Sequence, residues 1–277
     1  MSRLLPLLLL APACFTTSPY HWIDVQGARV HACLTGPPTA PVVVLESAAG
    51  QDLFAWDEVV EELSTVARVV TWSRPGLGHS GMGPVGRSSS RIVEELRIVL
   101  SELELEPPYV LVGHALGAFH VRTFAALHRD EVSALVLINP SHEDWLKRLK
   151  GTRTPAEWEE MGDAFHKEVN LLPEGPRREF ASVEEDADHM SRLPAPPPLP
   201  VWILTCTRHG EAESAAGRRG DDVVLWEELH AELAASMHDD ATVEHVVRSD
   251  LASDGLSERP ASVVTGVVWA LNETMRR

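Results

Sequence analysis

The sequence predicts an α/β fold, with a mostly parallel central sheet, helices on both faces and a small helical cap. Short apolar runs of strand length alternate with longer segments whose apolar residues recur at helical spacing. The short runs are hydrophobic at consecutive positions, which is typical of strands covered on both faces. The chain has 277 residues, 44% of them hydrophobic. That length suits one large domain, which we place at residues 20–277.

The first half of the chain begins with a hairpin and continues as alternating strands and helices. Residues 22–33 predict two strands joined by a tight turn at Gln26-Gly27. The following predicted strands share continuous runs of Val, Leu and Ile: residues 42–45, 67–72, 109–112 and 134–138. The predicted helices share apolar residues three and four positions apart: residues 57–63, 88–105 and 116–128.

The second half interrupts this alternation and then resumes it. Residues 141–195 are charged and rich in Trp and Glu, which predicts a helical cap inserted into the domain, and the acidic run 184–188 is expected to be a solvated face. A Pro-rich stretch, residues 194–200, ends the insertion. The remaining predicted elements are a strand at 201–205, a helix at 223–237, a strand at 241–247 and a helix at 260–276.

The charge balance excludes several functions. Lys plus Arg is 24 and Asp plus Glu is 41, so the formal net charge is −17. Binding to nucleic acid or to anionic lipid headgroups requires clustered cations, so neither partner is expected. Residues 141–277 hold 15 basic and 27 acidic side chains, net −12. Three cysteines without a CxxC spacing predict neither a disulfide framework nor a zinc site, and no metal or cofactor is expected.

The N-terminus is predicted to be an export signal. Arg3 precedes about ten apolar residues that end at Ala13, a run too short to span a bilayer, which takes about 20 residues. Residues 1–13 therefore match a signal peptide. Cys14, directly after Ala11-Pro12-Ala13, resembles the lipobox of bacterial lipoproteins, which implies a lipid on Cys14 as the membrane attachment. An ordinary cleaved signal and a short leader on a cytoplasmic protein are the alternatives to this cell-envelope localisation.

A second motif follows the strand 109–112 and precedes the next predicted helix. Gly113-His114-Ala115-Leu116-Gly117 has the place and spacing of a nucleophile elbow, G-x-Ser-x-G, with Ala115 where the motif has Ser. A methyl group has no lone pair and cannot attack a carbonyl carbon.

Together with its flanking loops, this motif resembles the α/β-hydrolase fold superfamily, and most closely its branch of small esterases, haloperoxidase-like and peptidase-like enzymes. Residues 45–50 correspond to the oxyanion loop, and Trp72-Ser-Arg-Pro-Gly-Leu-Gly-His-Ser80 resembles the superfamily's (Y/W)-D-R-x-G-x-G-x-S. The resemblance covers residues 20–277.

The resemblance implies a triad of nucleophile, base and acid, and two of its positions are replaced here. The base position, seven residues before Pro260, is Ser253, and the last histidine of the chain is His245, within a predicted strand. The acid position is Asn139 in one arrangement of the superfamily; in the other it follows the strand 201–205, where Glu211 is a candidate.

The resemblance also implies binding groups around the elbow. The expected oxyanion donors are the backbone N–H groups of Leu116 and of either Ala48 or Ser47, and the candidates for a pocket are His114, His142 and Trp145.

Two hypotheses follow from these residues. The first is an exported, non-catalytic protein that binds a small molecule or a protein partner; the acidic second half favours a neutral or cationic ligand. The second is an active esterase-like hydrolase, cleaving esters or amides, with a non-standard catalytic site. The missing Ser and His favour the first hypothesis, whereas the retained elbow glycines and oxyanion loop favour the second.

Overall fold

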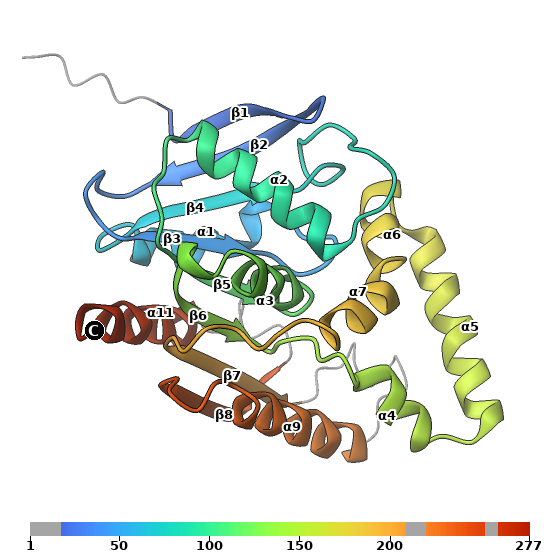
Figure 1. The fold of residues 1–277 in the computed structure, drawn as a ribbon. Helices are drawn as coiled ribbons and strands as arrows, with labels where there is room; N and C mark the ends of the chain where they lie inside the picture. Colours follow the sequence, from blue (N-terminus) through green and yellow to red (C-terminus); the bar gives the residue numbers. More distant parts are fainter. Residues whose placement is uncertain (1–17, 209–219, 253–259) are drawn as a thin grey trace, which may run out of the picture.

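An eight-stranded sheet forms the centre of the molecule (Figure 1). The computed structural model describes residues 18–208, 220–252 and 260–277; the predicted signal peptide 1–13, Cys14, Glu211 and Ser253 lie outside the described residues. The strand order is β1-β2-β4-β3-β5-β6-β7-β8. The strands are β1 (Tyr20–Val25), β2 (Ala28–Thr35), β3 (Val42–Glu46), β4 (Arg68–Ser73), β5 (Tyr109–His114), β6 (Val132–Ile138), β7 (Val201–Arg208) and β8 (Val243–Ala252).

The sheet is parallel except at β2, which pairs antiparallel with both β1 and β4. The hairpin turn between β1 and β2 has positive φ at Gln26 (53°) and Gly27 (86°), as a two-residue turn between twisted strands requires. The predicted hairpin, the predicted strands and their mostly parallel arrangement are therefore confirmed.

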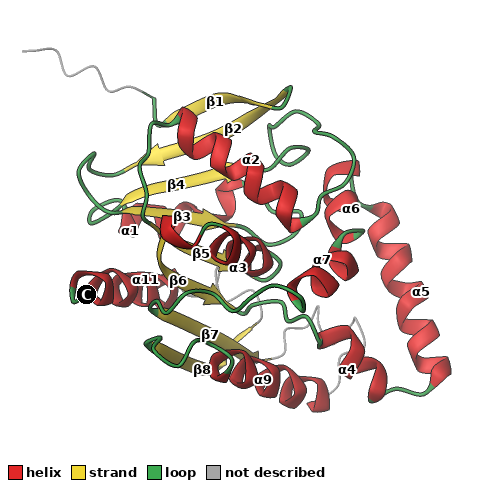
Figure 2. Ribbon diagram, in the orientation of Figure 1, coloured by secondary structure: helices red, strands yellow, loops and turns green. Residues whose placement is uncertain are grey.

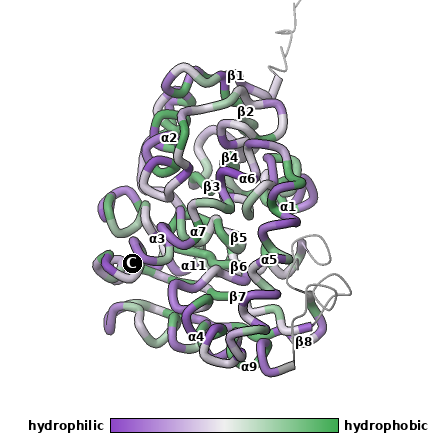
Figure 3. The backbone as a smooth tube through the Cα atoms, turned by 90° about the vertical axis from the view of Figure 1, so that its right-hand side faces the viewer, coloured by the Kyte–Doolittle hydropathy of each residue, from purple (hydrophilic) through white to green (hydrophobic). Residues whose placement is uncertain are grey.

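Helices cover both faces of the sheet (Figure 2). One face packs against α2 (Ser89–Glu102), α3 (Gly117–Leu127) and α9 (Gly220–Ala235), and the other against α1 (Asp57–Leu63) and α11 (Pro260–Met275). Two short 3₁₀ helices, η1 (Leu53–Trp56) and η2 (Arg129–Glu131), complete the layers. Successive side chains of a strand enter opposite cores: Val44 lies in the core under α2 and α3, and Val43 and Leu45 lie in the core under α1 and α11. Figure 3 shows hydrophobic segments gathered at the central strands.

Four helices form the cap between β6 and β7. They are α4 (Trp145–Gly151), α5 (Pro155–Leu171), α6 (Glu174–Phe180) and α7 (Val183–Met190). Figure 1 shows them beyond the carboxyl ends of the central strands, on the side to which the β6 arrow points. The acidic run 184–188 is not wholly solvated as predicted: Asp186 is buried, and its Oδ1 accepts the Ser89 N–H at 2.6 Å, so this carboxylate caps α2 from the cap.

Two ion pairs connect the cap to the rest of the fold. Arg122 on α3 holds Glu143, which precedes the cap helices, through two hydrogen bonds of 2.8 and 2.9 Å. Arg153, after α4, contacts Asp222 on α9 at 2.5 Å, and both side chains are buried. Burial would raise the pKa of Glu143, but the hydrogen bonds and charge of Arg122 lower it to about 2.

Strands β7 and β8 extend beyond their predicted ends. The sequence predicts loops after Thr205 and Val247, because the next residues are polar. In the structure the two strands stay paired to Arg208 and Ala252, with a register irregularity between Cys206 and Arg208. As β8 is the edge strand, its polar side chains reach solvent on one side while its backbone pairs with β7.

Two helical glycines test how tightly α11 packs on the sheet. A Cβ at Gly266 would lie 2.3 Å from the buried ring of Trp202, whereas a Cβ at Gly162 on α5 would meet nothing within 4 Å. We expect Gly266→Ala to lower the free energy of unfolding by about 2 kcal/mol through overpacking. Gly162→Ala, its control, should raise that free energy by up to about 1 kcal/mol through helix propensity. Urea unfolding measures both; shifts in the same direction would contradict this account of the α11 contact.

The Arg122–Glu143 pair predicts an acid-dependent stability. Because the pKa of Glu143 is lowered on folding, its contribution is fully present above about pH 4.5 and is lost as the pH falls toward 2. Glu143→Gln should therefore cost up to about 3 kcal/mol at pH 7 and clearly less at pH 3. Urea unfolding of the wild type, Glu143→Gln and the exposed control Glu160→Gln at both pH values measures this. An equal cost of Glu143→Gln at pH 7 and pH 3 would refute it.

Candidate functional site

The tight turn between β5 and α3 is the first part of the candidate site. Ala115 lies in this turn with φ 47°, a left-handed conformation that is strained for a residue with a Cβ. Its N–H donates to Ile138 O at 3.0 Å, and its own carbonyl accepts from Ala118 N and Ser141 N, both at 3.0 Å. Ala115 is half-buried, whereas every other residue of 111–120 is buried. The turn therefore presents a single methyl group at the position of a nucleophile.

Two glycines make this turn possible. A Cβ at Gly113 would lie 2.7 Å from Ala118 Cα, and a Cβ at Gly117 would lie 2.4 Å from Glu46 O and 2.7 Å from Ser47 O. Both distances are too short for any side chain, so α3 can approach β5 and the loop after β3 only with glycine at these positions. The backbone of the predicted elbow is thus intact.

The loop after β3 brings the predicted oxyanion donors to the elbow. Gly117 touches the carbonyls of Glu46 and Ser47, so this loop and the first turn of α3 lie side by side. Among the described residues, no acceptor lies within hydrogen-bonding distance of the N–H groups of Ala48 and Leu116. The Ser47 hydroxyl, in contrast, accepts the Trp56 Nε1–H at 2.8 Å and donates to Asp52 O at 3.2 Å, so it holds the loop instead of facing a substrate.

A buried arginine fixes the conformation of this loop. Arg74, at the end of β4, donates to Ser47 O at 3.0 Å and to Ala48 O at 2.8 Å. The same guanidinium contacts the carboxylates of Glu46 and Glu179, each at 2.6 Å, and all three side chains are at most 1% exposed. The Gly50 N–H donates to the other Glu179 oxygen at 2.9 Å. Since Glu179 belongs to α6, the cap and the oxyanion loop share one charged centre.

Burial disfavours the charged forms of Arg74, Glu46 and Glu179, whereas the attraction between the opposite charges favours them. Desolvation would lower the pKa of Arg74, but the two carboxylates raise it above its usual value. Desolvation would raise the pKa of Glu46, but Arg74 and hydrogen bonds from His120 and Trp72 lower it. The result is a charge-assisted network of fully ionised partners. Sequence reasoning did not identify Glu46, Arg74 and Glu179 as partners, because Glu179 lies 105 residues beyond Arg74 along the chain.

The predicted acid position is occupied by a buried amide. Asn139 follows β6 with φ 44° and is 3% exposed. Its Oδ1 accepts the Cys206 N–H at 3.2 Å and the Trp226 Nε1–H at 2.9 Å. This oxygen therefore joins β6, β7 and α9, and an amide cannot supply the negative charge that orients a catalytic imidazole.

Trp145, a predicted pocket residue, lies next to this position through Trp226. The two indole rings meet edge to face at 4.8 Å, and Trp226 also contacts the ring of His230 at 4.6 Å.

The histidines near the site have structural contacts. His114 is buried, with its ring 6.4 Å from that of Trp56. His142 is also buried, and its Nδ1 accepts the Asp144 N–H at 3.1 Å. Burial lowers the pKa of His142, so the neutral imidazole is favoured. The hypothesis that these residues line an open pocket at the elbow stays a prediction.

A chain of hydrogen bonds connects the two histidines of α9 and β8. His230 is fully buried, and burial lowers its pKa to about 3, so it is neutral. Its Nε2 donates to Pro140 O at 2.7 Å, which leaves Nδ1 to accept the Thr205 hydroxyl at 2.8 Å. Thr205 Oγ1 then accepts the His245 Nε2–H at 2.7 Å. His245, the last histidine of the chain, is thus engaged between strands.

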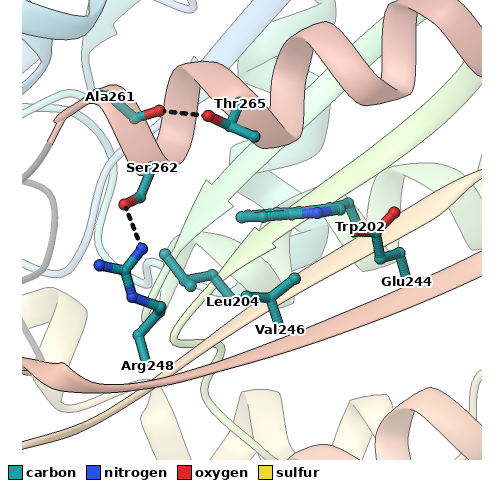
Figure 4. Close-up of a pocket in the computed structure, with 8 residues that line it drawn as sticks. All are labelled: Trp202, Leu204, Glu244, Val246, Arg248, Ala261, Ser262 and Thr265. Atoms are coloured by element: carbon teal, nitrogen blue, oxygen red, sulfur yellow. Dashed lines mark hydrogen bonds between the residues drawn. The ribbon is translucent and has the colours of Figure 1, made fainter.

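One hollow lies away from the elbow, between β7, β8 and α11 (Figure 4). Its volume is about 330 Å³. Trp202, Leu204 and Val246 form the apolar floor, and the polar groups come from Glu244, Arg248, Ser262 and Thr265. Arg248 donates to Asp250 and to Ser262, so its charge is already matched.

No described group of three or more His, Cys, Asp or Glu side chains has the arrangement of a metal site. Each helix within the described ranges is too short or too polar to cross a membrane.

Known proteins share this architecture. The chain is 23% identical to the uncharacterized protein YqjL of Bacillus subtilis over 210 residues, 76% of each protein. It is 31% identical to epoxide hydrolase 3 of Xenopus tropicalis over 140 residues, 48% of this chain and 38% of that protein. The chain spans about a fifth of the length of several other curated relatives.

Solved structures agree with the sequence relatives. A mutant epoxide hydrolase from Vigna radiata superposes with a TM-score of 0.64 at 15% identity, covering 91% of this chain and 98% of that one. A family model described as the alpha/beta hydrolase fold matches residues 41–192, more than half of the chain and the part that contains the elbow, the oxyanion loop and the cap. This protein is therefore a member of the α/β-hydrolase fold family.

Proposed function

We propose that this chain is a non-catalytic member of its family, exported to the cell envelope, where it binds a small molecule or a protein partner. The observation that carries the proposal is the methyl group of Ala115 at the elbow. In the triad mechanism the nucleophile and its base act as a unit, so the loss of either removes most of the rate enhancement.

The hydroxyl groups of two described loop serines, Ser47 and Ser80, are engaged in other contacts. Ser47 is held by Trp56 and Asp52. Ser80 donates to Ser73 O at 2.6 Å and accepts the His31 N–H at 2.9 Å, which occupies it within its own loop. On α9 and β8, His230 and His245 are engaged with Thr205. These contacts support a site without an activated nucleophile.

The backbone of the site supports ligand binding instead. The N–H groups of Ala48 and Leu116 donate to no described residue, so they are available to donate to an oxygen atom of a ligand. A neutral ligand with a carbonyl oxygen would fill this role without opposing the acidic second half of the chain, whose residues 141–277 carry a net charge of −12. A small neutral or cationic ligand is therefore the favoured class.

The alternative is an active hydrolase with a non-standard site, and the same two N–H groups favour it. Oxyanion donors alone can stabilise a tetrahedral intermediate, so slow cleavage of activated esters would be their expected residual activity. Hydrolases among the relatives, such as epoxide hydrolase 3, are consistent with this second hypothesis.

Labelling by an active-site probe and turnover of activated esters separate the two hypotheses. We expect neither the wild type nor Ala115→Ser to be labelled by a fluorophosphonate probe, because the hydroxyl of the variant would have no imidazole to take its proton. Labelling is read by mass spectrometry on both proteins, with a heat-denatured sample as control, and turnover is measured on a panel of activated esters. Wild-type labelling or turnover above the control would overturn the non-catalytic proposal.

The strain at Ala115 gives a stability prediction. In an ordinary helix Ala→Gly costs about 1 kcal/mol, but at φ 47° glycine removes strain of similar size. We expect Ala115→Gly to leave the free energy of unfolding unchanged or raise it by up to about 1 kcal/mol. Ala231→Gly, on the exposed side of α9, should lower it by about 1 kcal/mol. Thermal and urea unfolding compare the pair; equal losses would mean that Ala115 is not strained.

A further inference from the structure

An exposed aromatic cluster covers one face of the β1–β2 hairpin. Tyr20, Trp22 and Phe54 are 43%, 46% and 38% exposed, respectively. The ring of His31, which is buried beneath them, stacks against Tyr20 at 5.2 Å and against Trp22 at 4.7 Å. His79 contacts both His31 and Phe54, at 5.6 and 6.1 Å. We call these five residues the aromatic surface; they come from β1, β2, η1 and the loop after β4.

Strand alternation explains why these rings face solvent. Ile23 and Val25 point into the core under α2, so Tyr20 and Trp22 point to the opposite face of β1. β1 is the edge strand at the top of Figure 1, and α2 lies across the other side of the hairpin. Polar residues are the usual occupants of solvent-facing positions on an edge strand such as β1. Aromatic residues there leave a contiguous apolar area exposed, which is typical of an interaction site.

The charge of the hairpin differs from that of the chain. Residues 18–35 contain one acidic side chain, Asp24, and one basic side chain, Arg29, within a protein of net charge −17. Arg29 lies over the ring of Trp22 at 4.5 Å. The hairpin itself is therefore close to neutral and lacks the acidic excess of the whole chain.

The position of the aromatic surface along the chain indicates its occupant. Tyr20 follows Cys14 by six residues, and a chain of six residues spans at most about 22 Å. A lipid on Cys14 would hold β1 near the membrane surface. Trp and Tyr are the side chains enriched at the boundary between headgroups and acyl chains, because their rings are apolar and their tips polar.

We propose that the aromatic surface seats the folded domain on a lipid bilayer, with Tyr20, Trp22 and Phe54 in the headgroup region. The inference rests on the export to the cell envelope in the proposed function and on the lipid attachment that the sequence predicts at Cys14, and it adds a second contact made by the domain itself. A single lipid anchor leaves the domain free to rotate relative to the membrane. A second contact, made by the aromatic surface, would fix which face of the domain meets the lipid.

Brominated lipids test this seating directly. The full-length chain is bound to phosphatidylcholine vesicles with or without bromine on the acyl chains, and tryptophan emission is compared. We expect quenching in the wild type, loss of most of that quenching in Trp22→Phe, and no loss in the matched control Trp158→Phe on α5. Phenylalanine keeps the surface apolar, so Trp22→Phe removes the reporter and not the contact.

Co-sedimentation with the same vesicles separates the seating from the anchor. The triple variant Tyr20→Ser, Trp22→Ser, Phe54→Ser should bind vesicles more weakly than the exposed-residue control Phe165→Ser, Leu171→Ser, Val224→Ser, with circular dichroism to verify both folds. Vesicle binding without Trp22-dependent quenching would overturn the seating and leave the anchor intact; absence of vesicle binding would overturn both. A dimer that the triple variant abolishes, in place of quenching, would assign the surface to a second copy and also overturn the seating.

Discussion

The candidate site depends on the buried charge of Arg74. This guanidinium holds the carbonyls of Ser47 and Ala48, the strand-end carboxylate of Glu46 and the cap carboxylate of Glu179 at once. Removing one partner of a buried ion pair costs about 3–5 kcal/mol, because the remaining charge is left without compensation. Arg74 therefore connects the oxyanion loop, the end of β4 and the cap. Moving the cap away from the sheet would break the contacts between Arg74 and Glu179.

The same constraint explains how the elbow keeps its geometry with a methyl group at position 115. The elbow is maintained by backbone contacts and small residues: Gly113 and Gly117 allow α3 to approach, and Arg74 fixes the loop that α3 touches. None of these groups depends on a hydroxyl at position 115. A serine there contributes to catalysis and little to packing, so its replacement by alanine leaves the framework unchanged. The N–H groups of Ala48 and Leu116 keep their positions because Arg74 and the two glycines hold the backbone of this loop and of the elbow.

The sequence predicted the elements whose signals are local. Alternating apolar runs located the strands, and Gly113 and Gly117 located the elbow turn, whose tight contacts the structure confirms. The Arg74–Glu179 contact and the burial of Asp186 could not be predicted, because they join residues about 100 positions apart without a periodic pattern. The extensions of β7 and β8 were missed because pairing, and not hydrophobicity, holds their last residues. Buried polar contacts between distant segments leave the weakest trace in a single sequence.

The order of the sheet gives the two proposals a common geometry. β1, which carries Tyr20 and Trp22, is one edge of the sheet, and β8 is the other. Residues 201–277, which include β7 and β8, hold 7 basic and 14 acidic side chains, net −7, so the edge of the sheet opposite β1 is acidic. A domain seated on lipid through the neutral hairpin would turn this acidic end away from an anionic surface, since like charges repel over about a Debye length. The elbow, at the end of β5 between these two edges, would then lie away from the lipid contact.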